Sequence, residues 1–124
     1  MKKYYLKDYL PYPFKIPKVN LLFNINDNNV IVKYSMIVEP LYQSQQSIFL
    51  DGIDIQLLSL AIDGKTVSED SYEYTNLGLA IYNIPDVKFV IDITCAINPY
   101  SNKSLEGLYV SNNIITSQCE AEGF

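Results

Sequence analysis

The residue types that most often carry catalysis are scarce in this chain. It contains no histidine, so the usual general base near neutral pH and the commonest zinc ligand are both missing. Nucleophile pairs of the Ser-His or Cys-His type are therefore impossible within the chain. The 14 Asp and Glu residues leave a carboxylate mechanism conceivable, but no pair stands out by its spacing. Catalysis would need residues from elsewhere.

Two aspartates and two cysteines are the next candidates for chemistry. Asp51 and Asp54 resemble part of a calcium loop, but an EF-hand needs a longer run of spaced oxygen ligands, so a turn is favoured. Cys95 falls on the apolar side of an alternating segment, which predicts a small buried residue. It could pair with Cys119. The basic residues 1–8, however, are not followed by the apolar segment of a secretory signal. We therefore expect two reduced thiols in a cytoplasmic protein.

Composition limits the classes of partner. The 124 residues fit a single domain over residues 1–124. A net charge of −5 and a pI of about 4.5 argue against a nucleic-acid partner, because phosphates demand a basic surface. No segment approaches the roughly 20 apolar residues that span a bilayer, so we expect no membrane insertion.

Alternation of apolar and polar residues predicts strands along most of the chain. The pattern is clearest over residues 87–98, and residues 30–38 alternate in the same way. The Asp-Asn-Asn sequence at 27–29 tolerates positive φ and predicts a hairpin between residues 19–26 and 30–38. Shorter strands are expected at 47–50, 54–62, 66–67 and 77–82.

Residues 1–18 differ from the rest of the chain. They contain Pro11, Pro13 and Pro17 among five aromatic side chains. Proline removes backbone donors and holds the chain extended, so we expect an extended Pro/Tyr-rich arm laid across a sheet. Strands spaced about 8 to 12 residues apart indicate an all-β fold. The expected architecture is an antiparallel β-sandwich or a saddle-shaped sheet.

Three segments together resemble a known family. They are LDGIDIQL at 50–57 followed by IDG at 62–64, INP at 97–99 leading to LEGLY at 105–109, and SQCEAEGF at 117–124. In this order and spacing they resemble the N-terminal domain of bacterial aminopeptidase N, a zinc metallopeptidase of the gluzincin type. The resemblance covers essentially the whole chain, and the third segment is the most specific part of it.

The resemblance implies roles for two residues. In that family the third segment reaches into the active site and helps to hold the substrate's free α-amino group. It makes Glu120 the carboxylate that faces the ammonium, and Gln118 a wall of the first side-chain pocket. An extended strand is compatible with this, since residues i and i+2 point to one side about 6.5 Å apart. From chemistry alone, a Gln-x-Glu pair is a solvated strand edge, so the assignment depends on the resemblance.

The catalytic part of that family has no counterpart here. The H-E-x-x-H zinc motif and the glycine-rich recognition loop are absent from the chain. The resemblance therefore implies a zinc-dependent exopeptidase that removes N-terminal amino acids from peptides, with zinc bound in a catalytic domain that this chain stops short of. Alone, we expect the chain to be inactive and to self-associate through exposed apolar faces and strand edges. The alternative is a free-standing β-sandwich that binds another protein and has no catalytic role.

Overall fold

The described residues form an almost purely β structure. The computed structural model describes residues 3–43 and 46–118, which contain ten strands and two short 3₁₀ helices. In chain order these elements are η1 (Leu6–Asp8), β1 (Phe14–Ile25), β2 (Val30–Pro40), β3 (Ser47–Asp51), β4 (Gln56–Ile62), β5 (Lys65–Thr66), η2 (Glu69–Ser71), β6 (Tyr72–Thr75), β7 (Gly78–Tyr82), β8 (Phe89–Ile97), β9 (Gly107–Ser111) and β10 (Ile114–Gln118). The expected all-β, antiparallel fold class is confirmed.

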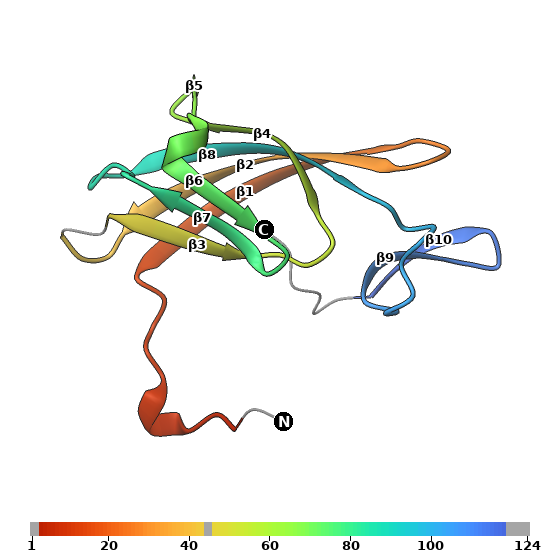
Figure 1. The fold of residues 1–124 in the computed structure, drawn as a ribbon, viewed down its shortest axis with the longest axis horizontal. Helices are drawn as coiled ribbons and strands as arrows, with labels where there is room; N and C mark the ends of the chain where they lie inside the picture. Colours follow the sequence, from red (N-terminus) through yellow and green to blue (C-terminus); the bar gives the residue numbers. More distant parts are fainter. Residues whose placement is uncertain (1–2, 44–45, 119–124) are drawn as a thin grey trace.

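The largest unit is a five-stranded antiparallel sheet in the order β1-β2-β8-β4-β5. The β1–β2 hairpin turns at Asn26 and Asn29, where the Asn26 N–H donates to the Asn29 carbonyl at 2.9 Å. β2 then pairs with β8, which is far away in the sequence but adjacent in the sheet. Figure 1 shows these long strands as one layer above the rest of the molecule.

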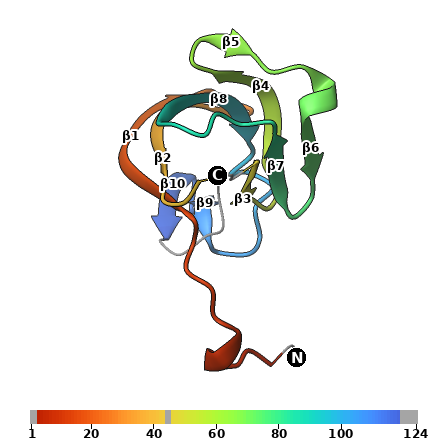
Figure 2. The same cartoon turned by 90° about the vertical axis from the view of Figure 1, so that its left-hand side faces the viewer.

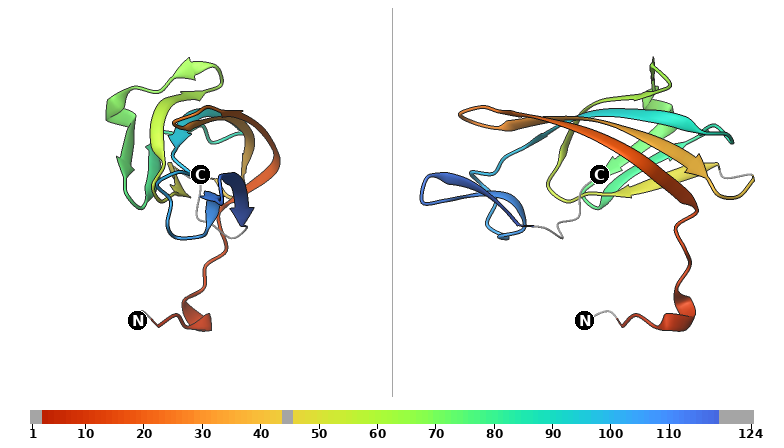
Figure 3. Two further views of the ribbon diagram at one scale, coloured as in Figure 1. Left: turned by 90° about the vertical axis from the view of Figure 1, so that its right-hand side faces the viewer. Right: turned by 180° about the vertical axis from the view of Figure 1, so that it is seen from behind.

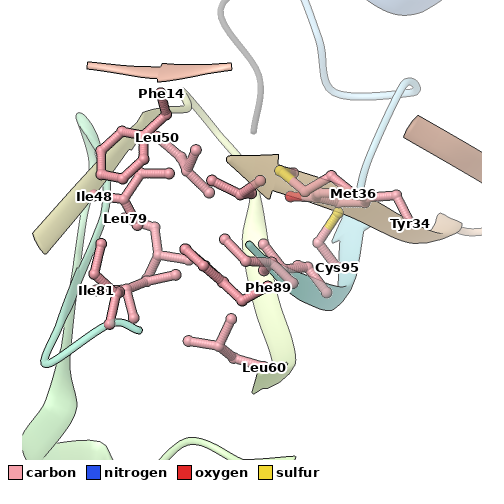
Figure 4. Packing of buried hydrophobic residues seen from close by; sticks show 14 of the residues in the cluster. Phe14, Tyr34, Met36, Ile48, Leu50, Leu60, Leu79, Ile81, Phe89 and Cys95 are labelled. Atoms are coloured by element: carbon pink, nitrogen blue, oxygen red, sulfur yellow. The ribbon is translucent and has the colours of Figure 1, made fainter. Parts of the chain in front are cut away.

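A three-stranded sheet, β3-β7-β6, forms the second layer. It lies on the concave side of the curved five-stranded sheet, as the end-on view in Figure 2 shows. The core fills the space between them, where buried side chains of β2, β8 and β4 meet those of β3 and β7 (Figure 4). Because side chains alternate across a strand, every second residue of β2 and β8 contributes to this core. Its members include Val30, Val32, Tyr34, Met36, Val38, Ile48, Leu50, Leu60, Leu79, Ile81, Phe89, Ile91, Ile93 and Cys95.

The arm expected over residues 1–18 is shorter in the structure. Phe14 is buried and begins β1. Residues 14–18 therefore belong to the sheet, where Phe14, Lys15 and Lys18 pair with β2 and the register shifts between Lys15 and Lys18. Tyr12 still contacts β3 through a hydrogen bond to the Phe49 carbonyl. The segment before it runs away from the two sheets instead of across one of them (Figure 1), and it contains the turn η1.

Two further elements were not anticipated from the sequence. One is β6, which completes the smaller sheet beside β7. The other is the β9–β10 hairpin, which forms its own two-stranded sheet. The hairpin lies at the end of the molecule opposite the N-terminal segment, as the view from behind in Figure 3 shows. This hairpin carries the last described residue, Gln118.

Candidate functional site

Gln118 is one of the two substrate-binding residues predicted from the sequence. It is the last residue of β10. The β9–β10 hairpin turns at Asn112 and Asn113, whose φ angles are +48° and +63°. Two consecutive positive φ values define the turn that matches strand twist in a tight hairpin, and asparagine adopts them readily. Gln118 lies opposite Gly107 and its side chain is exposed. The structure therefore presents this amide to the outside of the domain.

The loop before the hairpin is fixed by one side-chain amide. Asn102 donates through Nδ2 to the carbonyls of Glu106 (2.7 Å) and Leu108 (2.9 Å). Its Oδ1 accepts from both the backbone N–H and the hydroxyl of Ser104. A second tie runs from the Val110 N–H to the Pro99 carbonyl at 3.2 Å. These bonds attach β9, and so the base of Gln118's hairpin, to the end of β8.

The other predicted site residue is Glu120. It lies outside the described residues, as does Cys119. The expectation that Gln118 and Glu120 share one face of an extended segment therefore stays a prediction. Within the described part of the chain, Gln118 is exposed at the end of β10.

Away from this hairpin the described residues form an open apolar hollow of about 640 Å³. It exists because β1 and β2 have 12 and 11 residues whereas β3 and β7 have five each. The shorter sheet therefore leaves part of the longer sheet's concave face uncovered. The hollow is lined mainly by Val19, Leu21, Phe23, Val32, Tyr34, Met36, Phe49, Ile55, Cys95 and Ile97.

Two tyrosines bring hydroxyl groups to this hollow. Tyr12 donates its hydroxyl hydrogen bond to the Phe49 carbonyl at 2.9 Å, which ties the N-terminal segment to β3. Burial, and next the negative charge of Asp51, raise the pKa of Tyr12 to about 12. The Tyr34 hydroxyl is buried without a hydrogen-bond partner, and burial followed by the nearby Cys95 raises the pKa of Tyr34. Both phenols are therefore protonated at neutral pH.

The apolar lining of the hollow favours contact with other apolar groups. Cys95 is a free, buried thiol, as its position on the apolar face predicted. Burial raises its pKa to about 11, so the nucleophilic thiolate is scarce near pH 7. Among residues 3–43 and 46–118 no three His, Cys, Asp or Glu side chains gather to hold a metal ion, so the described residues do not fit a zinc centre.

The turn interpretation of the two aspartates agrees with the backbone. Asp51 ends β3, and Asp54 has a φ of +56° in the connection to β4. That left-handed conformation is one that Asp and Asn adopt more easily than most residues.

The apolar hollow was not predicted from the sequence. The available signal was Tyr34, a phenol on an otherwise apolar alternating face.

Comparison with solved structures defines the class of fold. The chain superposes on Legionella pneumophila aminopeptidase A, solved with aspartic acid, with a TM-score of 0.84 and 29% identity over 95% of this chain and 14% of that one. It also superposes on an M1 zinc metallopeptidase of Deinococcus radiodurans, in a mutant bound to a Tyr-Ser-Ala substrate, with a TM-score of 0.68 and 13% identity over 90% of this chain and 28% of that one. The fold is thus that of an M1 aminopeptidase N-terminal domain.

Sequence comparison is more specific. The chain is 36% identical to aminopeptidase N of Caulobacter vibrioides over 96% of its length, and 32% identical to that of Haemophilus influenzae over 99%. The Escherichia coli protein is 30% identical over 97%. The chain is therefore homologous to the N-terminal part of bacterial aminopeptidase N, as its three segments predicted. It spans only about 14% of the length of these relatives.

Two further comparisons complete the description. No family model matches the chain. In the part of the chain that the structure describes, no helix is long and apolar enough to cross a membrane.

Proposed function

We propose that this chain serves as the N-terminal, substrate-anchoring part of a zinc-dependent aminopeptidase that removes N-terminal amino acids from peptides. The observation that carries the proposal is similarity to aminopeptidase N over 96% to 99% of the chain in three bacteria, at 30% identity or more. We place the enzyme in the cytoplasm, which is compatible with the free thiol of Cys95.

The role assigned to this chain is binding. The described residues contain no metal-ligating cluster, and the raised pKa of Cys95 keeps its thiol protonated near neutral pH. The proposal therefore assigns catalysis and zinc to a separate domain of the same polypeptide. There zinc would act as a Lewis acid on the scissile carbonyl. The proposal agrees with an exposed Gln118 on a well-tethered hairpin, since a side chain that meets substrate across a domain boundary must point outward.

Glu120 is the residue on which the mechanism depends. Its carboxylate would accept a charge-assisted hydrogen bond from the substrate ammonium, with the Gln118 amide beside it. Holding the substrate's amine in one place fixes the distance from the substrate's N-terminus to the zinc-containing catalytic centre. This is a positioning contribution to catalysis. It also explains why only the first peptide bond would be cut, because an internal residue has no ammonium to offer.

The test is kinetic and uses the enzyme that contains this chain. Glu120→Gln keeps the shape of the side chain but removes its charge. A charged hydrogen bond contributes about 1.5–3 kcal/mol, so kcat/KM for a dipeptide with a free amine should fall about 10- to 150-fold. Glu106→Gln is the matched control, since Glu106 is an exposed acid in the loop before β9, and it should leave kcat/KM within about twofold.

A second measurement separates anchoring from misfolding. The ratio of activity on free-amine and N-acetylated substrates should collapse in the Glu120→Gln enzyme, while its melting temperature stays unchanged. Equal loss on both substrates, or no loss on either, would contradict the assigned role. If the coding frame holds no zinc motif at all, the alternative of a protein-binding β-sandwich takes precedence.

A further inference from the structure

The β9–β10 hairpin that carries Gln118 is joined to the end of β8 by the loop of residues 98–106. Within the described residues the hairpin forms a sheet of its own and pairs with neither of the two larger sheets. Figure 3 shows it beyond the end of β8, at one end of the molecule. The place of Gln118 relative to the rest of the domain therefore depends on how firmly this loop is held.

The first half of the loop is attached to the body of the domain. The Pro99 side chain is fully buried, and the Pro99 carbonyl accepts from the Val110 N–H at 3.2 Å. Asn98 fixes the turn that follows, because its Oδ1 accepts from the Tyr100 N–H at 3.0 Å. The loop thus starts from a fixed point next to the core.

The second half is held by Asn102, whose half-buried amide uses all its hydrogen-bonding capacity. Its Nδ2 donates to the carbonyls of Glu106 and Leu108, and its Oδ1 accepts twice from Ser104. A side-chain amide has two donor hydrogens and two acceptor lone pairs, so none is left over. Turning the amide over would bring its oxygen against two carbonyl oxygens. The network therefore permits a single orientation.

The two carbonyls that Asn102 holds lie on either side of Gly107. Gly107 is the residue opposite Gln118 in the hairpin register, and it has a φ of +69°. Leu108, which follows it, pairs with Ser117. The Asn102 amide thus fixes the backbone on both sides of the residue that faces Gln118. A displacement of this backbone passes to Gln118 through the strand pair.

We propose that Asn102 is a positioning residue that sets substrate selectivity through Gln118. The inference rests on the proposed function, in which Gln118 is a wall of the pocket for the first side chain of a peptide. An apolar pocket separates side chains that differ by one methylene by about 10- to 200-fold, so the place of its wall decides which side chain fits. Asn102 itself touches no substrate. It keeps the wall where the pocket needs it.

The first test compares two substrates in the enzyme that contains this chain. Asn102→Asp keeps the side-chain shape but turns the donating Nδ2 into an anionic acceptor, which repels the carbonyls of Glu106 and Leu108. The ratio of kcat/KM for a peptide that begins with leucine to that for one that begins with alanine should change by about tenfold. Asn83→Asp is the matched control, since Asn83 is exposed after β7 and Asp tolerates its positive φ. It should leave the ratio within about twofold.

A double-mutant cycle shows whether Asn102 acts through Gln118. Gln118→Ala should change the same ratio by about fivefold or more. Once this wall is removed its position no longer matters, so adding Asn102→Asp should change the ratio by less than about twofold. A merely structural role of Asn102 gives equal losses on both substrates, or an effect in the double variant as large as in the single one. Either result would overturn the inference.

The Gln118→Ala enzyme also separates this inference from the proposed function. If Gln118→Ala shifts the ratio and Asn102→Asp does not, the role of Asn102 alone is refuted. If Gln118→Ala leaves the ratio unchanged, the proposed role of Gln118 fails and the role of Asn102 fails with it.

Ser104→Ala keeps the test decisive if the Asn102→Asp enzyme does not fold, as its melting temperature would show. This change removes only the hydroxyl that donates to the Asn102 Oδ1 at 2.7 Å and leaves both Nδ2 bonds in place. Losing one hydrogen bond should shift the selectivity ratio about two- to tenfold. A ratio equal to that of the wild type would overturn the proposal.

Discussion

At the scale of single residues, the Tyr34 hydroxyl is the clearest anomaly. It is the one buried side-chain polar atom of the described residues that has no hydrogen-bond partner. Leaving such a group unpaired costs about 1–3 kcal/mol, a cost that a phenylalanine at the same place would avoid. The hydroxyl therefore does not stabilise this domain.

The prediction is that Tyr34→Phe raises the free energy of unfolding by up to about 1–3 kcal/mol, the cost of the unpaired hydroxyl. Tyr12→Phe is the comparison, because its hydroxyl donates to the Phe49 carbonyl. That variant should lose about 0.5–1 kcal/mol. Urea unfolding measures both changes. A loss above 1 kcal/mol in Tyr34→Phe would show that the hydroxyl has a partner.

Cys95 gives a prediction about pH. Burial raises the pKa of its thiol from 9.0 to about 11, so the folded state holds this proton more tightly than the unfolded chain. The resulting stability is fully present below pH 9 and is lost as the pH rises from 9 to 11. Relative to Cys95→Ala, the wild-type protein should therefore lose on the order of 1–2 kcal/mol between pH 8 and pH 11. Burial raises the pKa values of Tyr12 and Tyr34 in both proteins, and Cys95→Ala removes only the second, smaller cause of the shift at Tyr34. A constant difference across this range would contradict the buried thiol.

Residue-scale prediction from sequence succeeded where one strand decides the outcome. The burial of Cys95 follows from alternation within β8 alone. The isolation of the Tyr34 hydroxyl does not, because it depends on which atoms of other strands come near it. Register across a sheet is set by all its strands together.

At the scale of elements, the connection between β6 and β7 depends on Gly78. This glycine has a φ of +156°, and a Cβ there would meet the Leu50 carbonyl oxygen and lie 2.8 Å from the Phe49 ring. β7 must approach β3 this closely because Gly78 pairs with Asp51. Only a residue without a side chain allows it.

We predict that Gly78→Ala lowers the free energy of unfolding by at least about 3 kcal/mol, the sum of overpacking and backbone strain. Gly64→Ala is the control. Its φ is +80° but a Cβ there meets nothing within 4 Å, so strain alone should cost about 1–2 kcal/mol. Thermal or urea unfolding separates the two. Equal losses would show that strain, and not close packing, governs both positions.

The elements that the sequence revealed are those with one buried face. β2 and β8 pair over nine residues, and their buried side chains alternate with more exposed ones along most of each strand, so their pattern is strong. β6 was not predicted from the sequence because Tyr72 and Thr75 are only half buried and the two residues between them are exposed. This burial pattern is typical of an edge strand. The β9–β10 hairpin was not predicted because every residue of its two strands is half-buried or exposed. Its Asn112-Asn113 turn was the available signal.

At the scale of the whole molecule, two sheets of unequal length explain both the core and the hollow. Where β3 and β7 cover β2 and β8, the side chains are buried. Beyond them the long strands leave apolar surface open, and within the described residues β1 pairs only with β2. An exposed apolar concavity of this kind usually marks a contact surface. This agrees with a domain that works against other parts of a larger enzyme.

The most direct test of that account is the coding DNA downstream of the Phe124 codon. The account predicts an open frame that continues for several times the present length and contains an H-E-x-x-H motif, because the chain spans about 14% of its aminopeptidase N relatives. Such a frame would supply the zinc site that the described residues do not provide. A stop codon directly after Phe124, with no such motif in the frame, would contradict a role in peptide cleavage and leave binding as the function of this domain.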